Sequence, residues 1–213
     1  MSRQYTQKKR AEKVAETRRR IVEAAVELHG QIGPAATTLS MIAERAGVQR
    51  HTLYAHFPDD RSLLLACSGM ALERDPMPGA AAWARIEDLR GRLHQGLSAI
   101  YGWYARNAEL VACVLRDAEH HALTREIAEL RFGPPMAACH EVLGAALTAR
   151  QRALLAVALN FHAWRTLAYQ AQLSPAAAAE VFVEAIVPAP SSQRRAKRPA
   201  SHRERVRKTA RRR

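Results

Sequence analysis

Cysteine is scarce in this chain of 213 residues. Its cysteines, Cys67, Cys113 and Cys139, are odd in number, widely spaced and without a Cys-x-x-Cys pair. This pattern excludes a disulfide framework and a zinc knuckle. We expect three buried free thiols.

Long apolar runs are missing as well. No stretch reaches the roughly 18 apolar residues that a membrane-spanning helix needs. The first residues are charged rather than arranged as a signal peptide. We therefore expect a cytoplasmic protein with no membrane partner.

Aromatic and β-branched residues are few. Aromatics make up 6% of the chain, whereas hydrophobic residues as a whole make up 48%, most of them Ala and Leu. Together with abundant Arg and Glu, this composition favours helices throughout. The predicted fold class is all-α.

Sequence signatures of enzymes are also lacking. The chain contains no nucleophile elbow, phosphate loop or zinc signature. Its nine histidines include the pair His120 and His121, close to Asp117 and Glu119. Adjacent residues on a helix point about 100° apart, so this pair cannot face one ion jointly. We predict no enzyme, no cofactor and no metal site.

The positive charge of the chain is concentrated at its two ends. Of the net charge of +13, residues 1–20 carry +6 and residues 191–213 carry +10, which leaves −3 for the body between them. Terminal blocks of like charge are typical of disordered tails, which bind nucleic acid or simply aid solubility. We favour contact with the DNA backbone for the N-terminal block and leave both alternatives open for the C-terminal block.

Residues 38–57 are the most informative segment. Leu39 to Ala46 has an apolar face at helical spacing, with Thr38 suited to cap its first turn. Gly47 suits the turn that follows, because a residue without Cβ is least strained there. A second helix from Gln49 to Phe57 completes a predicted helix-turn-helix.

The second helix has an inward and an outward side. With Leu53 and Phe57 buried, His51 and Ala55 point outward, and Arg50, Thr52 and Tyr54 flank them. Arginine can pair with guanine O6 and N7 through two hydrogen bonds, and alanine can contact a thymine methyl. The candidate DNA-binding residues are Thr37, Thr38, Arg50, His51, Thr52, Tyr54 and His56.

Residues 18–65 resemble the N-terminal domain of the TetR family of bacterial transcription regulators. The resemblance implies that Tyr54 and His56 contact phosphates. Three positions depart from the family pattern: Gln49 replaces a small capping residue, His51 replaces glycine or proline, and Asp60 replaces a basic residue, with Arg61 as a weak substitute. The matching residues are Ile42-Ala43, Ala46-Gly47-Val48, Thr52-Leu53-Tyr54, His56-Phe57 and Leu63-Leu64, with Ile21, Ala24, Ala25, Leu28 and Gly33 upstream.

The remaining helices are predicted from apolar spacing and from helix-breaking residues. The run 75–79, Asp-Pro-Met-Pro-Gly, divides the chain into two domains. The expected helices are 17–31, 59–74, 83–106, 107–117, 122–147 with a break or kink at 133–135, 150–172, and 175–187 capped by Ser174.

Helices 150–172 and 175–187 are apolar over more than one face, so both of their sides need cover. The resemblance implies a homodimer formed by these two helices. A twofold dimer presents its recognition helices about 34–36 Å apart or somewhat more, so an inverted-repeat operator in double-stranded DNA is expected.

The resemblance also implies a small-molecule pocket in the C-terminal domain. Aromatic residues at helical spacing are more often plain core, and Trp164 alternatively lies at the dimer interface. The candidate lining residues are Trp103, Tyr104, His120, His121, Phe161, His162 and Trp164.

Four regions are therefore expected: a flexible basic arm (1–16), a helix-turn-helix domain (17–75), a helical regulatory and dimerisation domain (76–187) and a disordered basic tail (188–213). The function expected is that of a dimeric repressor released from its operator by an unidentified small-molecule effector. The alternative is an architectural DNA-binding protein that needs no ligand.

Overall fold

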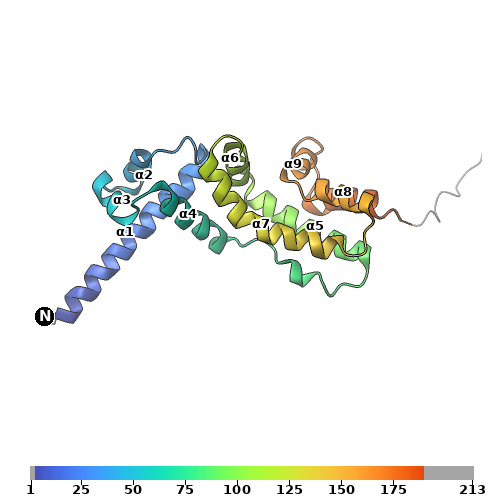
Figure 1. The fold of residues 1–213 in the computed structure, drawn as a ribbon, viewed down its shortest axis with the longest axis horizontal. Coiled ribbons are helices and arrows are strands. Elements are labelled where there is room, and N and C mark those ends of the chain that lie inside the picture. Colours follow the sequence, from blue (N-terminus) through green and yellow to red (C-terminus); the bar gives the residue numbers. More distant parts are fainter. Residues whose placement is uncertain (1–2, 190–213) are drawn as a thin grey trace, which may run out of the picture.

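The structure, a computed structural model, describes residues 3–189, and within that range it is all-helical as predicted. It is elongated, with the N-terminal helices at one end and the last three helices at the other (Figure 1). The N-terminal helices are α1 (Arg3–Gln31), α2 (Leu39–Ala46), α3 (Arg50–His56) and α4 (Asp60–Arg74).

A short 3-10 turn, η1 (Ala80–Ala82), leads into the larger helical unit. None of the helices within residues 3–189 is long and apolar enough to cross a membrane. The helices of this unit are α5 (Leu89–Arg106), α6 (Ala108–Ala118), α7 (Ala122–Gly144), α8 (Ala149–Ala158), α9 (Phe161–Tyr169) and α10 (Pro175–Ile186).

Each of the two helical units has its own hydrophobic core. The first lies among α1 to α4 and includes Ile21, Leu53 and Phe57, which are at most 1% exposed. The second lies among α5 to α10 and includes Tyr101 and Trp164. Burial of such apolar side chains is the main stabilising contribution in both units.

Helix α1 begins at Arg3, well before the predicted start at Thr17. Residues 3–16 contain no glycine or proline and are rich in Lys, Arg, Ala, Glu and Gln, which have high helix propensity. The described side chains before Thr17 are exposed, so this stretch continues the helix without packing against the body. The apolar pattern used to place the start marks only where the packing begins.

The predicted single helix over 150–172 is wrong. The chain turns at Leu159 and Asn160, and the Asn160 side chain accepts hydrogen bonds from the backbone N–H groups of His162 and Ala163 to start α9. The carbonyls at the end of α8 gain side-chain partners: the hydroxyl of Tyr101 donates to Ala158 O at 2.7 Å and that of Tyr104 to Leu159 O at 2.8 Å. These bonds satisfy the carbonyls that the break leaves free.

Two other helix boundaries differ from the prediction. Helix α5 starts at Leu89 rather than at 83, because Asp88 caps it by accepting from Arg90 N and Gly91 N. Of the break or kink predicted at 133–135, the break does not occur, because α7 continues through Pro134 and Pro135. Its last turns stay helical although prolines lack a backbone donor, since Cys139 and Leu143 are fully buried against the second core.

Candidate nucleic-acid interface and adjoining cavity

The turn between α2 and α3 has the predicted geometry. The Thr38 hydroxyl accepts from Met41 N at 3.2 Å and caps α2. Gly47 closes α2 with φ +64, a left-handed conformation that favours glycine. Arg20 of α1 donates to the carbonyls of Ala46 and Gly47 and so holds the turn against α1.

Helix α3 presents the predicted side chains to solvent. Leu53 is fully buried and Phe57 is 1% exposed, and these residues hold α3 on the core. The expectation of a weak cap is confirmed, since Gln49 makes no side-chain capping bond. Of the candidate DNA-binding residues on this helix, Arg50, His51 and Tyr54 are exposed, and Thr52 and His56 are half-buried.

Arg50 and Tyr54 lie next to each other on the outer side of α3. One Nη of Arg50 donates to the Tyr54 hydroxyl at 3.2 Å, and the guanidinium carbon lies 5.8 Å from the centre of the Tyr54 ring. Residues four apart on a helix are neighbours, which allows this contact. The tyrosine therefore orients the arginine predicted to read bases.

The remaining candidates near α3 have structural partners. The Thr37 hydroxyl donates to Gly33 O at 2.7 Å, and Thr37 is half-buried. Arg61 forms two hydrogen bonds, at 2.8 and 3.0 Å, to the same carboxylate oxygen of Glu126 on α7. Arg61 is thus bound to the larger unit rather than free for a phosphate.

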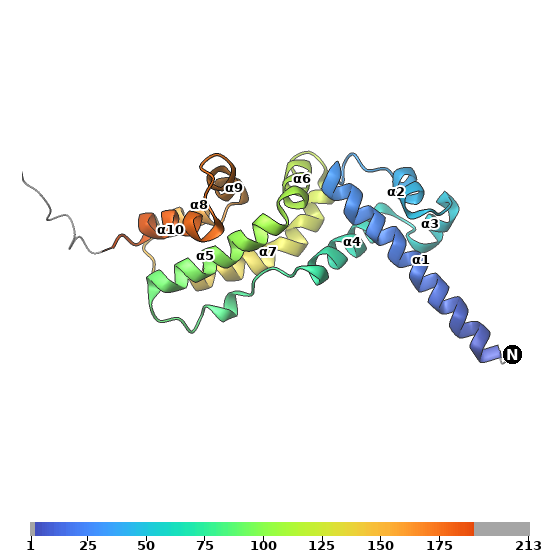
Figure 2. The same ribbon diagram turned by 180° about the vertical axis from the view of Figure 1, so that it is seen from behind.

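A small cavity of about 70 Å³ lies between α1, α4, α6 and α7. Figure 2 shows these helices meeting beside α2 and α3. The last turns of α1 and the N-terminal part of α7 form two of its walls. Apolar side chains dominate its lining, which is typical of small-ligand sites. The lining residues are Val26, His29, Pro34, Leu64, Cys67, Ser68, Ala71, Leu72, Trp103, Asn107, Leu110, Val111, Val114, Thr124, Ile127, Ala128, Arg131 and Phe132.

Polar side chains at this cavity bind mainly one another. Cys67 Sγ lies 3.4 Å from His29 Nδ1. Burial lowers the pKa of His29 to about 4 and raises the pKa of Cys67 to about 12, so both are uncharged at neutral pH. Arg131 donates to Ser68 Oγ at 3.0 Å and to Leu65 O at 2.8 Å.

Of the residues predicted to line a pocket, Trp103 borders this cavity. Tyr104, Phe161 and Trp164 instead pack on one another in the second core, with ring centres 5.3 to 5.5 Å apart. The histidines are scattered: His120 and His162 are exposed, and His121 borders a second hollow together with Thr37 and Asp60.

Asp117 connects α6 to the loop between α1 and α2. It is 2% exposed and accepts a hydrogen bond from Ala35 N at 2.8 Å, while the adjacent Arg116 donates to Ile32 O at 2.8 Å. Gly33 has φ +93, and a Cβ there would lie 2.3 Å from both side chains. The close approach therefore requires glycine at this position.

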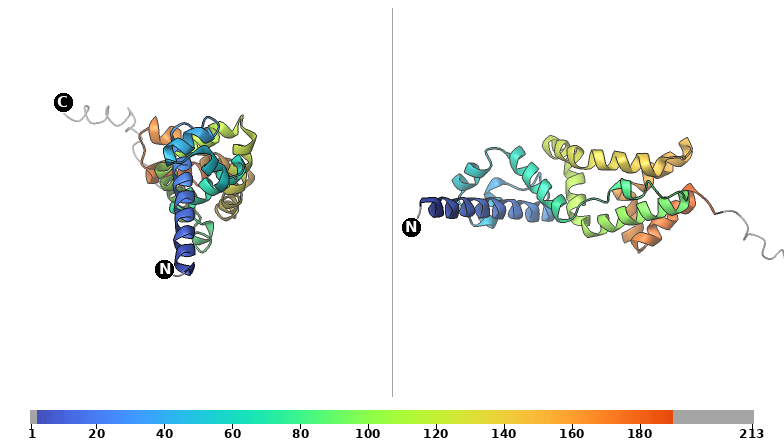
Figure 3. Two further views of the ribbon diagram at one scale, coloured as in Figure 1. Left: turned by 90° about the vertical axis from the view of Figure 1, so that its left-hand side faces the viewer. Right: turned by 90° about the horizontal axis from the view of Figure 1, so that it is seen from below.

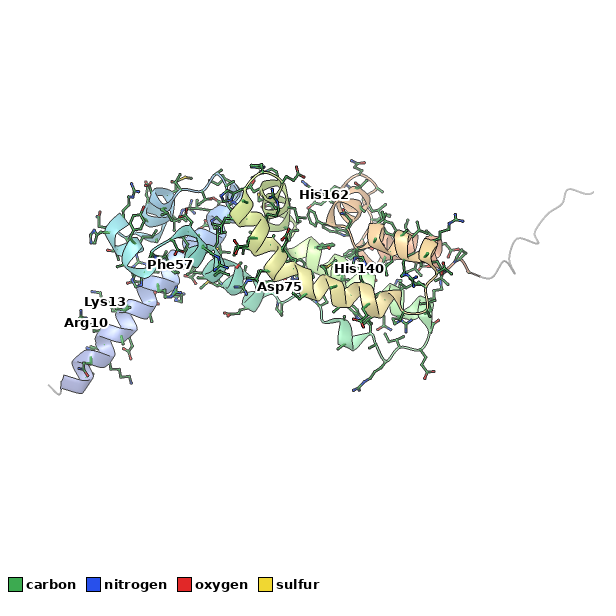
Figure 4. The ribbon with its side chains drawn as sticks, in the orientation of Figure 1. Arg10, Lys13, Phe57, Asp75, His140 and His162 are labelled. Carbon is green, nitrogen blue, oxygen red and sulfur yellow. The ribbon has the colours of Figure 1, made fainter. Side chains whose placement is uncertain are left out.

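Asp75 connects the end of α4 to the end of α5 (Figure 4). Its carboxylate accepts two hydrogen bonds from Arg106, at 2.9 and 3.0 Å, and one from Asn107 at 2.8 Å. The Arg106 guanidinium lowers the pKa of Asp75. Trp103 of the cavity wall donates its indole N–H to Asp75 O at 2.8 Å. The cavity thus lies between two polar links to the helix-turn-helix unit.

Sequence reasoning missed His29, Asp75 and Asp117. His29 follows the buried stripe of α1 and gives no separate signal. Asp75 was assigned to a breaker segment, and Asp117 was considered only as a neighbour of the histidine pair. No motif distinguishes a buried carboxylate from the many exposed ones.

Comparison with known proteins agrees with this geometry. Residues 21–67 match the family model of the bacterial regulatory proteins of the tetR family. No curated protein sequence is matched. The matched segment contains the helix-turn-helix and ends at the cysteine beside His29.

Solved structures share the overall fold. A TetR-family transcriptional regulator from Mesorhizobium loti has a TM-score of 0.59 at 18% identity, over 81% of this chain and 96% of that one. FadR from Bacillus subtilis, solved with stearoyl-CoA, has a TM-score of 0.55 at 18% identity, over 79% and 96%. AibR, solved with isovaleryl coenzyme A and operator DNA, has a TM-score of 0.57 at 19% identity, over 81% and 98%.

The matched segment contains the helix-turn-helix, and the similar structures share the fold over about four fifths of the chain. Residues 21–67 are thus similar to the helix-turn-helix part of the tetR family of bacterial regulatory proteins, and the chain shares its helical fold with solved regulators described as members of that family.

Proposed function

We propose that the chain is a dimeric, sequence-specific repressor, acting in the cytoplasm, that leaves an inverted-repeat operator when a small molecule binds. The observation that carries this proposal is the outer side of α3. There Arg50 lies beside Tyr54 on a helix anchored by the buried Leu53 and Phe57. An exposed arginine beside a tyrosine at the start of a recognition helix is suited to bidentate recognition of guanine.

Exposed apolar residues on α8 and α10 support a dimer with a second copy of the chain. Val157 is 52% exposed and Val181 is 47% exposed. Each lies in an exposed stripe of small apolar residues at a spacing of four, which forms one face of a helix. The stripes are Ala149, Ala153 and Val157 on α8, and Ala177, Val181 and Ala185 on α10.

The cavity supports an effector that is compact, apolar and uncharged. Among the described residues that line it, Arg131 is the only lysine or arginine, and two of its five N–H donors are bound to Ser68 and Leu65. An anionic head group would exchange water for this single guanidinium in a lining that is otherwise mostly apolar, which is costly. FadR and AibR were solved with coenzyme A thioesters. The phosphates of such ligands are anionic, and the mostly apolar lining of this cavity does not suit them.

The DNA-binding part is tested by selection from a pool of random-sequence duplexes with the purified full chain. Enrichment of one inverted repeat by the wild type, and its loss or relaxation at one symmetric position in Arg50→Ala, is expected. Tight binding without enrichment would reject a sequence-specific regulator and favour the ligand-independent architectural protein. Dimerisation is tested by sedimentation of the wild type and of a Val157→Glu/Val181→Glu variant, which should be monomeric.

The effector class is tested with toluene and benzoate, which share a ring but differ in charge. Toluene should raise the melting temperature and lower operator affinity, and benzoate should do neither. Isovaleryl coenzyme A is the third probe. Release of the operator by the thioester or by benzoate, but not by toluene, would overturn the uncharged class while leaving the DNA-binding proposal intact.

A further inference from the structure

The first turns of α1 form an isolated helical arm, residues 3–16, that projects from the molecule. In Figure 3 (right) this arm extends past α2 and α3, in the direction away from α5 to α10. All of residues 7–16 are exposed. A helical segment without packing contributes little to the stability of the fold, so stability does not account for the arm.

The arm carries cations without carboxylate partners. Lys8, Lys9, Arg10 and Lys13 form no ion pair with any side chain that the structure describes. By contrast Arg19, nearer the body, is paired at 2.8 Å with both Glu16 and Glu23. Residues 1–20 carry a net +6, whereas the body from 21 to 190 carries −3. Lys9 lies over the Tyr5 ring, 4.7 Å from its centre, but attraction to carboxylates does not explain these cations.

Two of the cations lie on the side of α1 that faces the helix-turn-helix. Arg10 precedes the buried Ile21 by eleven positions, about three helical turns, so both lie on one face. Lys13 precedes Arg20 by seven positions, about two turns, and Arg20 contacts the carbonyl of Gly47. Figure 4 shows Arg10 and Lys13 projecting from the arm on the side where α3 lies.

We propose that this arm is a second DNA-contacting element, which binds the phosphates that flank the segment read by α3. The proposal rests on the proposed function, because it requires α3 to be docked on an operator. Charge complementarity and continuity with the α3 surface identify DNA as the occupant. The arm recognises no base: flexible lysines bind phosphate as point charges and carry no sequence information.

The length of the arm sets the extent of the contact. Fourteen helical residues span roughly 20 Å, since each adds about 1.5 Å. At about 3.4 Å per nucleotide of one strand, this corresponds to roughly six base pairs. Each half of the operator therefore has an outer segment that contributes affinity but no sequence preference.

The test compares two duplexes for the full chain. One contains only the selected inverted repeat, and the other extends it by eight base pairs of arbitrary sequence at each end. Binding is measured by fluorescence anisotropy over a salt series for the wild type, for Arg10→Gln/Lys13→Gln and for the charge-matched control Arg85→Gln/Arg150→Gln. Arg85 and Arg150 are exposed residues of the larger unit.

Arg10 and Lys13 of both protomers give four phosphate contacts per dimer. These contacts should make the slope of log K against log salt concentration steeper by roughly 3 to 4. We expect this increase on the extended duplex for the wild type and the control, and no increase for Arg10→Gln/Lys13→Gln. The variant should keep its affinity for the short duplex and its melting temperature.

Equal slopes for all three proteins on the extended duplex would overturn the arm proposal and leave the operator proposal standing. A change in the base sequence selected by the arm variant would also overturn it, because phosphate contacts carry no base preference. Failure of the wild type to select any repeat would instead reject the proposed function itself.

Discussion

The carboxylate of Asp117 on α6 accepts a hydrogen bond from the backbone N–H of Ala35, 2.8 Å away in the loop between α1 and α2. This bond joins a helix of the larger unit to the segment that leads into the helix-turn-helix. Val111 and Val114 of the same α6 line the cavity. Occupation of the cavity therefore acts on a helix that is bound to the DNA-binding unit.

We expect Asp117→Ala to uncouple the two units. The change leaves the Ala35 N–H without its partner and should lower the free energy of unfolding by about 1–3 kcal/mol. It should also reduce the effect of toluene on operator affinity while operator binding itself persists. Asp117→Asn is the comparison variant, since its amide oxygen still accepts from Ala35 and only the bond from Arg116 is lost. An unchanged toluene effect in Asp117→Ala would show that the coupling follows another route.

Arg50 and Tyr54 should differ in their contributions at the operator. Loss of the guanidinium in Arg50→Ala should weaken binding by about 1–3 kcal/mol and relax one base position. Tyr54→Phe removes only the hydroxyl that accepts from Arg50. We expect a smaller loss from it, with the preferred sequence retained. Competition assays with single-base operator variants measure both; a changed preference in Tyr54→Phe would identify the tyrosine as a base reader.

His29 should make the fold sensitive to acid. Burial lowers its pKa from 6.5 to about 4, and the Asp117 carboxylate opposes this shift in part. Between these values the unfolded chain binds a proton that the folded chain does not, so stability is complete above pH 6.5 and declines as the pH falls towards 4. The full loss from this group is roughly 3 kcal/mol.

Urea unfolding at a series of pH values from 7 to 4.5 measures this decline. His29→Gln should have a flatter profile, whatever its stability at pH 7. His51→Gln, at an exposed position on α3, is the control and should follow the wild type. Parallel profiles for His29→Gln and the wild type would exclude His29 as the origin of the acid sensitivity.

Filling the cavity should abolish the ligand response. Ala128 of α7 borders the cavity, and leucine at this position would occupy much of its roughly 70 Å³. Ala128→Leu should still bind the operator but should no longer be released by toluene. Overpacking is expected to cost about 1–3 kcal/mol, so a melting curve accompanies the binding assay. Ala138→Leu, at an exposed position of the same helix away from the cavity, is the control. Release of Ala128→Leu by toluene would place the effector elsewhere.

The helix-turn-helix was predictable because its signals are local. Thr38, Gly47 and the apolar residues of α2 and α3 specify a cap, a left-handed turn and a buried face within 20 residues. The same reasoning predicted which side chains of α3 are exposed. These features depend on neighbours along the chain, and the family resemblance rests on the same residues.

The cavity and its polar links were not predictable, because they depend on residues far apart in the sequence. Asp117 contacts Ala35 across 82 positions, and Cys67 contacts His29 across 38. The break before α9 was missed for a similar reason. Apolar spacing continues through Leu159, whereas the acceptors and donors that permit the break come from Asn160 and from tyrosines on α5.

Helix α1 is one continuous element of 29 residues that reaches from the basic arm to the cavity wall. At one end it carries Lys9 and Arg10, and near the other it contributes Val26 and His29. Arg20, bound to the turn after α2, lies between these ends. A stiff rod held near its middle acts as a lever, so a small tilt forced by a bound molecule at one end displaces the other end in the opposite direction. The arm, which lies far from this point, would then be drawn away from the DNA.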